Sequence, residues 1–284
     1  VDRLAVTVIH DGKPVSLNGN EIACVALEHL CRSLDEAKEM PPKPMAVKSI
    51  VTTELFKAIA THHKVSCLDV LTGFKYIGQK ISQWDEEKAA NVQTHHFIFG
   101  AEESYGFLVG THVRDKDAII ASCLLSDAAL QMKRQGKTLV DLLYEIYRKH
   151  GIYREKLLSL VFEGKEGFDL IHQTMARLCQ NPPLAINGVV VTAIEDYLKR
   201  TVTFPESGKT EPLLLPKSDV VRFWLADHTK IVVRPSGTEP KIKLYCGTFE
   251  KHSFTDNHAL EKGLLRCDRK AEEYLLVTKK LLGL

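Results

Sequence analysis

Long hydrophobic runs are absent from this sequence of 284 residues. The longest apolar stretches, such as Val189 to Ile194, have the length of a β-strand. A helix needs roughly 18 to 20 consecutive apolar residues to span a bilayer, so the sequence predicts no membrane-spanning helix and no membrane partner.

An excess of charge of either sign is also absent, since 38 Lys and Arg residues face 36 Asp and Glu residues. No net field would draw the whole molecule onto nucleic acid, so we expect no nucleic-acid partner and only local anion sites. Apolar residues make up 44% and charged residues 26% of the chain, which is typical of folded globular proteins. At roughly 100 to 200 residues per domain, the length favours about two domains.

The seven cysteines form no C-x-x-C pair, which argues against a cysteine-based metal or redox site. An odd number of widely spaced cysteines predicts reduced, mostly buried thiols and therefore a cytoplasmic protein. The first residues contain no initiator Met, no basic segment and no apolar core of a signal peptide. We therefore expect the sequence to begin at a cut end within a longer chain.

Strand and helix patterns alternate through the first half of the sequence, which predicts an α/β fold. Leu4 to Ile9 is typical of a strand, and the turn residues after it predict a hairpin with residues 14–17. Asn20 can cap a following helix, and His95 to Phe99 is typical of a short strand. From about residue 165 the pattern becomes β-rich and ends in a long amphipathic helix, so we expect a second domain there.

Residues 234–241, Arg-Pro-Ser-Gly-Thr-Glu-Pro-Lys, lie between two apolar strands and concentrate side chains that bind phosphate. Arg234 offers a bidentate fork for an anion, and Ser236 and Thr238 offer hydroxyl donors. A tight turn at Gly237 would point backbone N–H groups at the same anion. A hairpin loop whose hydroxyls satisfy its own backbone explains these residues equally well when they are taken alone.

Residues 102–106, Glu-Glu-Ser-Tyr-Gly, place two carboxylates and a hydroxyl after a predicted strand. Ligands of open α/β sheets bind at the carboxyl ends of strands, where carboxylates can accept hydrogen bonds from sugar hydroxyls. Taken alone, the segment is better explained as a solvated acidic turn.

Together the two segments resemble the sugar-binding and phosphate-binding loops of the α-D-phosphohexomutase superfamily, which includes phosphoglucomutase and phosphomannomutase. Residues 72–75, Thr-Gly-Phe-Lys, resemble a third loop of that family, and residues 110–117 extend the match beyond the sugar loop. Order and spacing agree over nearly the whole chain. Tyr105 stands where several relatives have a small residue, and Lys241 and Lys243 occupy strand positions of which many relatives fill one with Arg.

The resemblance implies a mixed-sheet α/β phosphohexomutase domain 3, followed by an α+β C-terminal domain with an antiparallel sheet packed by helices. On this mapping residues 1–16 are a remnant of domain 2, residues 17–164 are the sugar-binding domain 3, and residues 165–284 are the phosphate-binding domain 4. The substrate-binding residues that the match implies are Lys75, Glu102, Ser104, Arg234, Ser236, Gly237, Thr238 and Lys243.

Residues 1–6, Val-Asp-Arg-Leu-Ala-Val, are similar to the second half of the family's D-x-D-x-D-R metal loop. On that mapping Asp2 is the last of three aspartate ligands of Mg²⁺, and the other two belong to the upstream half of the same enzyme. The serine that carries the phosphoryl group would also lie upstream, so the resemblance implies no catalytic residue in this chain.

The implied reaction moves a phosphoryl group between C1 and C6 of a hexose. Its partners are hexose 1-phosphate, hexose 6-phosphate and the intermediate hexose 1,6-bisphosphate. The alternative interpretation is a fragment that binds sugar phosphates without turning them over.

Two pairs of adjacent histidines, at 62–63 and 95–96, suggest a metal site at first sight. Neighbours on a strand point apart, however, and no Cys or carboxylate completes a ligand set at useful spacing. We expect surface or packing roles for these histidines. Trp84 and Trp224 are expected in the core or at an interface, because no basic stripe accompanies them.

Overall fold

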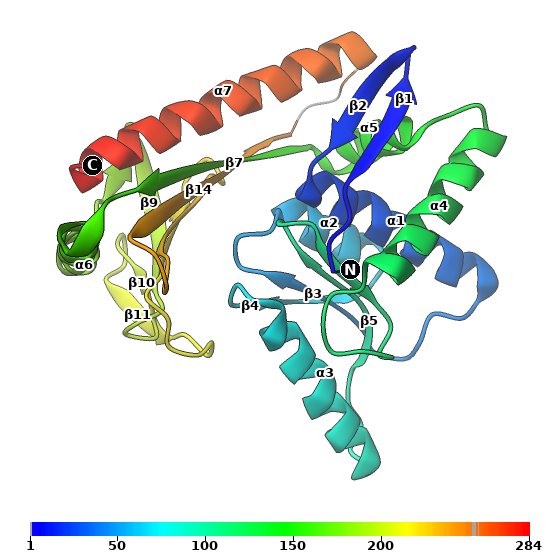
Figure 1. Cartoon of the computed structure of the whole chain (residues 1–284), viewed down its shortest axis with the longest axis horizontal. Coiled ribbons are helices and arrows are strands. Elements are labelled where there is room, and N and C mark those ends of the chain that lie inside the picture. The colour runs from blue at the N-terminus through cyan, green and yellow to red at the C-terminus, as the bar shows by residue number, and fades with distance from the viewer. Residues whose placement is uncertain (1, 252–253, 255) are drawn as a thin grey trace. The chain divides into compact units, whose positions relative to one another are not determined.

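The computed structural model describes residues 2–251, 254 and 256–284 (Figure 1). The chain divides into two compact units. Unit 1 is built from residues 2–151 with a short return segment ending at Asn257, and unit 2 from residues 152–251 and 258–284. Val1, on which part of the expected metal loop falls, lies outside the described residues.

Unit 1 begins with the expected hairpin and contains a four-stranded sheet. In this sheet β3 pairs in parallel with both β4 and β5, whereas β6 runs antiparallel to β5. The sheet is therefore mixed, as predicted. The strands of unit 1 are β1 (Val6–His10), β2 (Lys13–Leu17), β3 (Pro44–Ser49), β4 (Ser66–Val70), β5 (His96–Glu102) and β6 (Gly106–Val109).

Helices cover both faces of this sheet. Phe74, Ile77, Ile81 and Trp84 of α3 pack on one face against a core that includes Val47 and Leu108. On the other face the Phe56 ring of α2 stacks on Phe99, with ring centroids 5.9 Å apart. The helices described in unit 1 are α1 (Gly19–Ala37), α2 (Glu54–His62), α3 (Phe74–Ala89), α4 (Ala118–Arg134) and α5 (Leu139–His150).

The first helix is capped by Asn18, so the expected cap at Asn20 is wrong. Asn18 Oδ1 accepts from the Glu21 backbone N–H, and Glu21 Oε2 accepts from the Asn18 N–H, at 3.0 and 2.8 Å. This reciprocal pair satisfies two N–H groups that a helix N-terminus otherwise leaves open. Asn20 instead accepts a hydrogen bond from the Thr53 N–H at 3.0 Å, where α2 begins.

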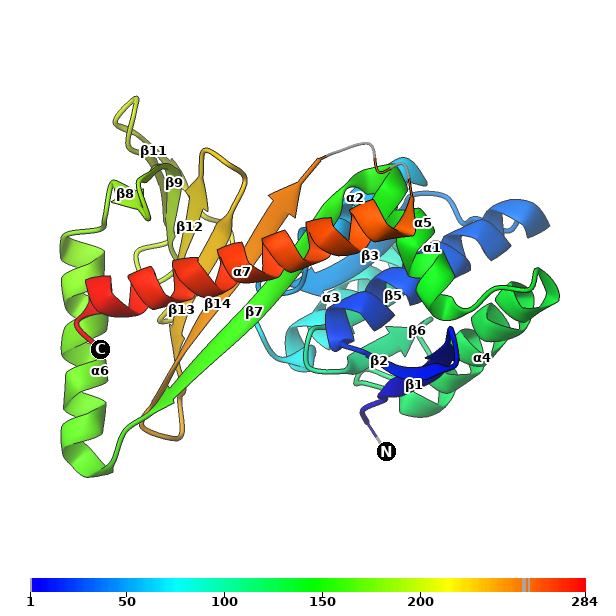
Figure 2. The same cartoon turned by 90° about the horizontal axis from the view of Figure 1, so that it is seen from above.

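Unit 2 is an antiparallel sheet of order β11-β10-β9-β12-β13-β14-β7, with β8 paired to β9. Apolar side chains of one face pack against α6 and α7, which Figure 2 shows beside the sheet. This confirms the antiparallel sheet packed by helices that the resemblance implied. Its elements are β7 (Ile152–Val161), α6 (Gly164–Gln180), β8 (Ala185–Ile186), β9 (Val189–Asp196), β10 (Thr201–Phe204), β11 (Lys209–Pro212), β12 (Val221–Leu225), β13 (Lys230–Pro235), β14 (Lys241–Glu250) and α7 (Asn257–Leu282).

The second unit begins at Ile152, earlier than the expected residue 165. The reason is β7, which pairs with β14 along its whole length, from Ile152 opposite Glu250 to Val161 opposite Lys241. A strand belongs to the unit that supplies its hydrogen-bond partners. The change in composition after residue 164 marks α6, which follows the first strand of the unit.

Two further properties of the chain were expected from composition. All seven cysteines are free thiols, of which Cys24, Cys31, Cys246 and Cys267 are buried and Cys123 is exposed. Within the described ranges, no helix combines the length and the apolar composition needed to cross a membrane.

Candidate functional site

The predicted sugar segment begins at the carboxyl end of β5, a strand in the middle of the unit 1 sheet. Glu102 is the last residue of β5, and only 7% of it is exposed, so it is not part of a solvated acidic turn. Tyr105 has φ +68°, a left-handed conformation that is costly for a residue with a bulky side chain. Strain of this kind is frequent at ligand-binding loops.

The structure joins two of the segments that the sequence singled out. Glu102 Oε1 accepts a hydrogen bond from the backbone N–H of Gly73 at 2.6 Å. Gly73 has φ +120° and precedes α3, whose second residue is the exposed Lys75. The bond therefore fixes the start of α3 against the end of β5. The ammonium of the exposed Lys75 lies 5.0 Å from the centroid of the Tyr76 ring.

Glu103 anchors the other side of the sugar segment. Its Oε2 accepts a hydrogen bond from Ser49 Oγ at 3.1 Å, and Ser49 Oγ lies 2.8 Å from Thr52 Oγ1. A Cβ on Gly19 would lie 2.0 Å from the Glu103 carbonyl oxygen, so α1 can begin this close to the loop only with glycine. Sequence reasoning missed Ser49, because nothing local marks a serine at the end of an apolar strand.

Lys48 is a fully buried lysine next to Ser49 in β3. Its ammonium lies 2.9 Å from a carboxylate oxygen of Glu54 and 2.9 Å from one of Asp69. A buried charge is tolerated only when it is paired and hydrogen-bonded, and two carboxylates supply that here. A single lysine inside an apolar run was the sequence signal that could have revealed this cluster.

Lys116, from the extended match at residues 110–117, lies beside the sugar segment. A Cβ on Gly106 would lie 2.5 Å from its Cδ and 3.5 Å from Glu102 Oε2, so glycine lets the lysine pass next to the loop. Its ammonium is 2.9 Å from Asp115 Oδ1 and 3.8 Å from Asp2 Oδ2. The hydrogen bond from Lys116 holds the pKa of Asp115 below its usual value.

The described residues do not by themselves fit a magnesium site. Asp2 is a largely exposed carboxylate whose neighbour is a lysine ammonium. No group of three or more His, Cys, Asp and Glu side chains in the described part of the chain is arranged to hold a metal ion. Mg²⁺ usually takes octahedral oxygen ligation from carboxylates, substrate phosphates and water.

The predicted phosphate segment connects β13 to β14 in unit 2. Arg234 lies in β13 directly opposite Lys243 of β14, so both cationic side chains share one face of the sheet. The Ser236 N–H donates to the Lys241 carbonyl at 2.7 Å, and the Thr238 N–H donates to Ser236 Oγ at 3.4 Å. The Ser236 hydroxyl thus accepts a hydrogen bond from the backbone of its own loop, as expected for a hairpin loop whose hydroxyls satisfy its own backbone.

Gly237 contributes to this loop in a different way from the one expected. It has no positive φ, and a Cβ there would meet nothing within 4 Å. Neither conformation nor space therefore demands glycine at this position. Exposure of the Gly237 backbone is the remaining property that suits close approach of an anion.

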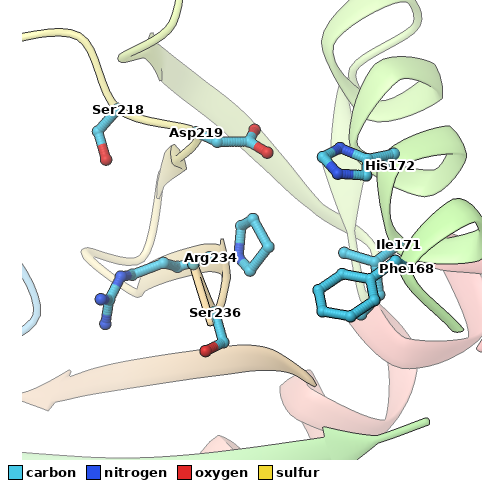
Figure 3. Close-up of a pocket in the computed structure, with 9 residues that line it drawn as sticks. Phe168, Ile171, His172, Ser218, Asp219, Arg234 and Ser236 are labelled. Carbon is cyan, nitrogen blue, oxygen red and sulfur yellow. The ribbon is translucent and has the colours of Figure 1, made fainter. Parts of the chain in front are cut away.

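A cavity of about 350 Å³ adjoins the phosphate segment (Figure 3). Arg234, Ser236 and Gly237 line it together with His172 of α6 and Asp219, which precedes β12. In Figure 3 the Asp219 carboxylate points toward His172, whereas the guanidinium of Arg234 points away from it. Burial raises the pKa of Asp219, and the charge of His172 opposes that rise.

Sequence reasoning missed His172 and Asp219. The fold brings them together from α6 and from the loop before β12, which are 47 residues apart. Neither residue lies in a recognisable local motif, so only the fold reveals that they are neighbours of the phosphate segment.

His63 and the two tryptophans have roles within the fold. His63 Nε2 lies 3.1 Å from Glu28 and its Nδ1 lies 3.0 Å from Asp35, so it bridges α1 and α2. These hydrogen bonds, the one with Glu28 first, raise the pKa of His63. Trp84 is a core residue, as expected, and Trp224 Nε1 donates to Glu195 at 2.8 Å.

Comparison with known proteins gives one answer from sequence and structure. Residues 18–150 match the family model for phosphoglucomutase/phosphomannomutase, alpha/beta/alpha domain III. A phosphoglucomutase of Staphylococcus aureus is 40% identical over 245 residues, which are 86% of this chain and 42% of that protein. The phosphoglucomutase of Staphylococcus haemolyticus is 39% identical over 235 residues, 83% of this chain and 41% of that protein.

A solved structure shares the fold. The exocytosis-sensitive phosphoprotein parafusin, a phosphoglucomutase from Paramecium, aligns with a TM-score of 0.58 at 15% identity. The alignment covers 98% of this chain and 44% of parafusin. The sequence match and the fold place residues 18–150 in the class of phosphoglucomutase/phosphomannomutase alpha/beta/alpha domains. The chain belongs to the α-D-phosphohexomutase superfamily. It spans about two fifths of the length of the bacterial relatives it matches.

Proposed function

We propose that this chain supplies the sugar-binding and phosphate-binding loops of a phosphohexomutase of the phosphoglucomutase/phosphomannomutase type. Such an enzyme moves a phosphoryl group between C1 and C6 of a hexose phosphate through hexose 1,6-bisphosphate. The relatives at about 40% identity are phosphoglucomutases, which supports a hexose phosphate as the ligand.

The observation that carries the proposal is the hydrogen bond between Glu102 and the Gly73 N–H. One oxygen of the Glu102 carboxylate binds the loop that begins α3, so this loop is already in place before a ligand arrives. Loops held in their bound conformation cost less entropy on binding. Glu102 and Ser104 then accept and donate hydrogen bonds to sugar hydroxyls, and Lys75 adds a cation beside them.

Arg234, Ser236, Gly237, Thr238 and Lys243 hold the phosphate that is not reacting. An Arg guanidinium binds a phosphate through two parallel hydrogen bonds, and the paired Lys243 adds a second positive charge on the same face. Their contribution to catalysis is positioning, because a correctly held substrate reacts as if its partner were at very high concentration.

The phosphoryl-carrying serine belongs to the upstream part of the enzyme in this proposal, as do two of the three aspartates that would hold Mg²⁺ with Asp2. Bound Mg²⁺ would offset charge on the transferring phosphoryl group. This chain's own residues therefore bind and orient the sugar phosphate, in the cytoplasm, and the isolated chain does not turn it over.

A phosphorus NMR titration of glucose 1-phosphate tests the proposal in one sample. Added to the 284-residue chain, the ligand signal should broaden on binding, and no glucose 6-phosphate signal should appear. Conversion would mean that the chain holds its own nucleophile, and an unchanged signal would mean that it does not bind hexose phosphates. Adding the upstream sequence distinguishes the two interpretations. A mutase should then convert glucose 1-phosphate, whereas a protein that only binds sugar phosphates should not.

A further inference from the structure

A second cavity, of about 190 Å³, lies in unit 1 at the opposite end of β5 from Glu102. Three of its apolar lining residues come from α3 and β5, namely Ile81 and Trp84 of α3 and Phe97 of β5. All three are buried and belong to the core between α3 and the sheet. The cavity therefore has an apolar, largely aromatic wall that reaches the core.

Two imidazoles lie on the polar side of this cavity. His96 Nδ1 is 2.6 Å from the Pro42 carbonyl oxygen, which can only accept, so this nitrogen carries the proton and Nε2 remains available. The rings of His95 and Trp84 are in an edge-to-face arrangement, with their centroids 5.7 Å apart. The buried Nδ1 of His95 has no hydrogen-bond partner among the described residues, which is uncommon for a buried polar atom.

The charge at the mouth of the cavity favours an anion. Asp85 is bound by the guanidinium of Arg114, so its negative charge is offset within the protein. Lys88, one turn further along α3, also lines the cavity, and its ammonium forms no ion pair within the part of the chain that the structure describes. One cation and two imidazoles therefore surround an aromatic wall.

We propose that this cavity binds a small aromatic carboxylate, with the ring against Trp84 and Phe97 and the carboxylate at Lys88. An apolar cavity of about 150 Å³ is large enough for benzene, so this one has room for a single ring with one substituent. The polar groups that line it match a carboxylate better than a neutral substituent. The site involves neither the sugar segment nor the phosphate segment, so it does not depend on the proposed function.

Tryptophan fluorescence tests the proposal, because Trp84 and Trp224 are the only tryptophans. In Trp224→Phe, emission reports on Trp84 alone, and benzoate should change it along a saturable curve. A ligand of about nine non-hydrogen atoms is expected to bind with a Kd on the order of a millimolar. Benzamide, which has the same shape without the charge, should bind about tenfold more weakly, because charge-assisted hydrogen bonds are the stronger ones.

A matched pair of variants assigns the carboxylate contact. Lys88→Met should remove the preference for benzoate over benzamide, whereas Lys80→Met, earlier in the same helix and bonded to Gln83, should keep it. Saturation-transfer NMR of benzoate with the unsubstituted chain repeats the comparison independently of the Trp224 substitution. Absence of saturable benzoate binding in both measurements, equal affinity for the two probes, or an equal loss in Lys80→Met would overturn the proposal.

Discussion

Replacing Glu102 separates its structural contact from its proposed contact with sugar. Glu102→Ala removes the charge-assisted hydrogen bond to the Gly73 N–H and leaves that donor without its partner. Such a bond to a charged group contributes about 1.5 to 3 kcal/mol. For a unit of about 150 residues, each kcal/mol shifts the melting temperature by about 2 to 4 °C, so Glu102→Ala should melt roughly 3 to 12 °C lower.

Glu102→Gln is the informative partner of that variant. The amide oxygen can still accept from Gly73, so its melting temperature should stay close to that of the unsubstituted chain, while its affinity for glucose 1-phosphate falls. Affinity for inorganic phosphate should not change. Differential scanning calorimetry and isothermal titration give both quantities, with the exposed Glu86→Ala as control.

Two results would refute this reasoning about Glu102. If Glu102→Ala melts like the unsubstituted chain, the bond to Gly73 contributes nothing to the fold. If Glu102→Gln binds glucose 1-phosphate as tightly as before, the carboxylate does not contact the sugar.

Two more predictions follow from buried ionisable groups. Burial, together with the charge of Lys149, lowers the pKa of His150 from 6.5 to about 4. On acidification, His150 is therefore protonated at a higher pH in the unfolded chain than in the folded chain. Stability should therefore fall as pH drops from 6.5 toward 4, and His150→Gln should flatten that part of the melting profile; an identical slope in the variant would contradict the assignment. Lys48→Met leaves Glu54 and Asp69 facing each other without the ammonium, and urea unfolding should show a loss of about 3 to 5 kcal/mol. A loss below 1 kcal/mol would mean that water already solvates this cluster.

Hydrophobic periodicity is a local property, so it predicted the alternating strands and helices of unit 1 and the β-rich pattern of unit 2. The mixed sheet and the antiparallel sheet were implied by the resemblance to the phosphohexomutase superfamily. The boundary at Ile152 was missed because the partner of β7 is β14, about ninety residues further along the chain. Pairing over such a distance leaves no local signal in either strand. Composition therefore marked the first helix of unit 2 rather than its first strand.

The candidate site was likewise predicted only in part. Glu102 was found from its segment, but its bond to Gly73 joins the end of β5 to the loop after β4, and these come together only in the folded chain. Ser49, His172 and Asp219 carry no motif of their own. Tertiary proximity brings them to the loops, so no local pattern could have identified them.

Binding of glucose 1-phosphate by the Arg234→Ala variant tests whether this chain holds the phosphate group of a hexose phosphate. Loss of a bidentate contact between charged groups should lower the affinity for glucose 1-phosphate by roughly tenfold to a hundredfold, because such a contact contributes about 1.5 to 3 kcal/mol. Affinity for free glucose should stay unchanged, and Arg269→Ala, an exposed arginine on α7, should bind both ligands like the unsubstituted chain. Equal losses for glucose 1-phosphate and glucose, or no loss for either, would mean that Arg234 does not bind the phosphate group.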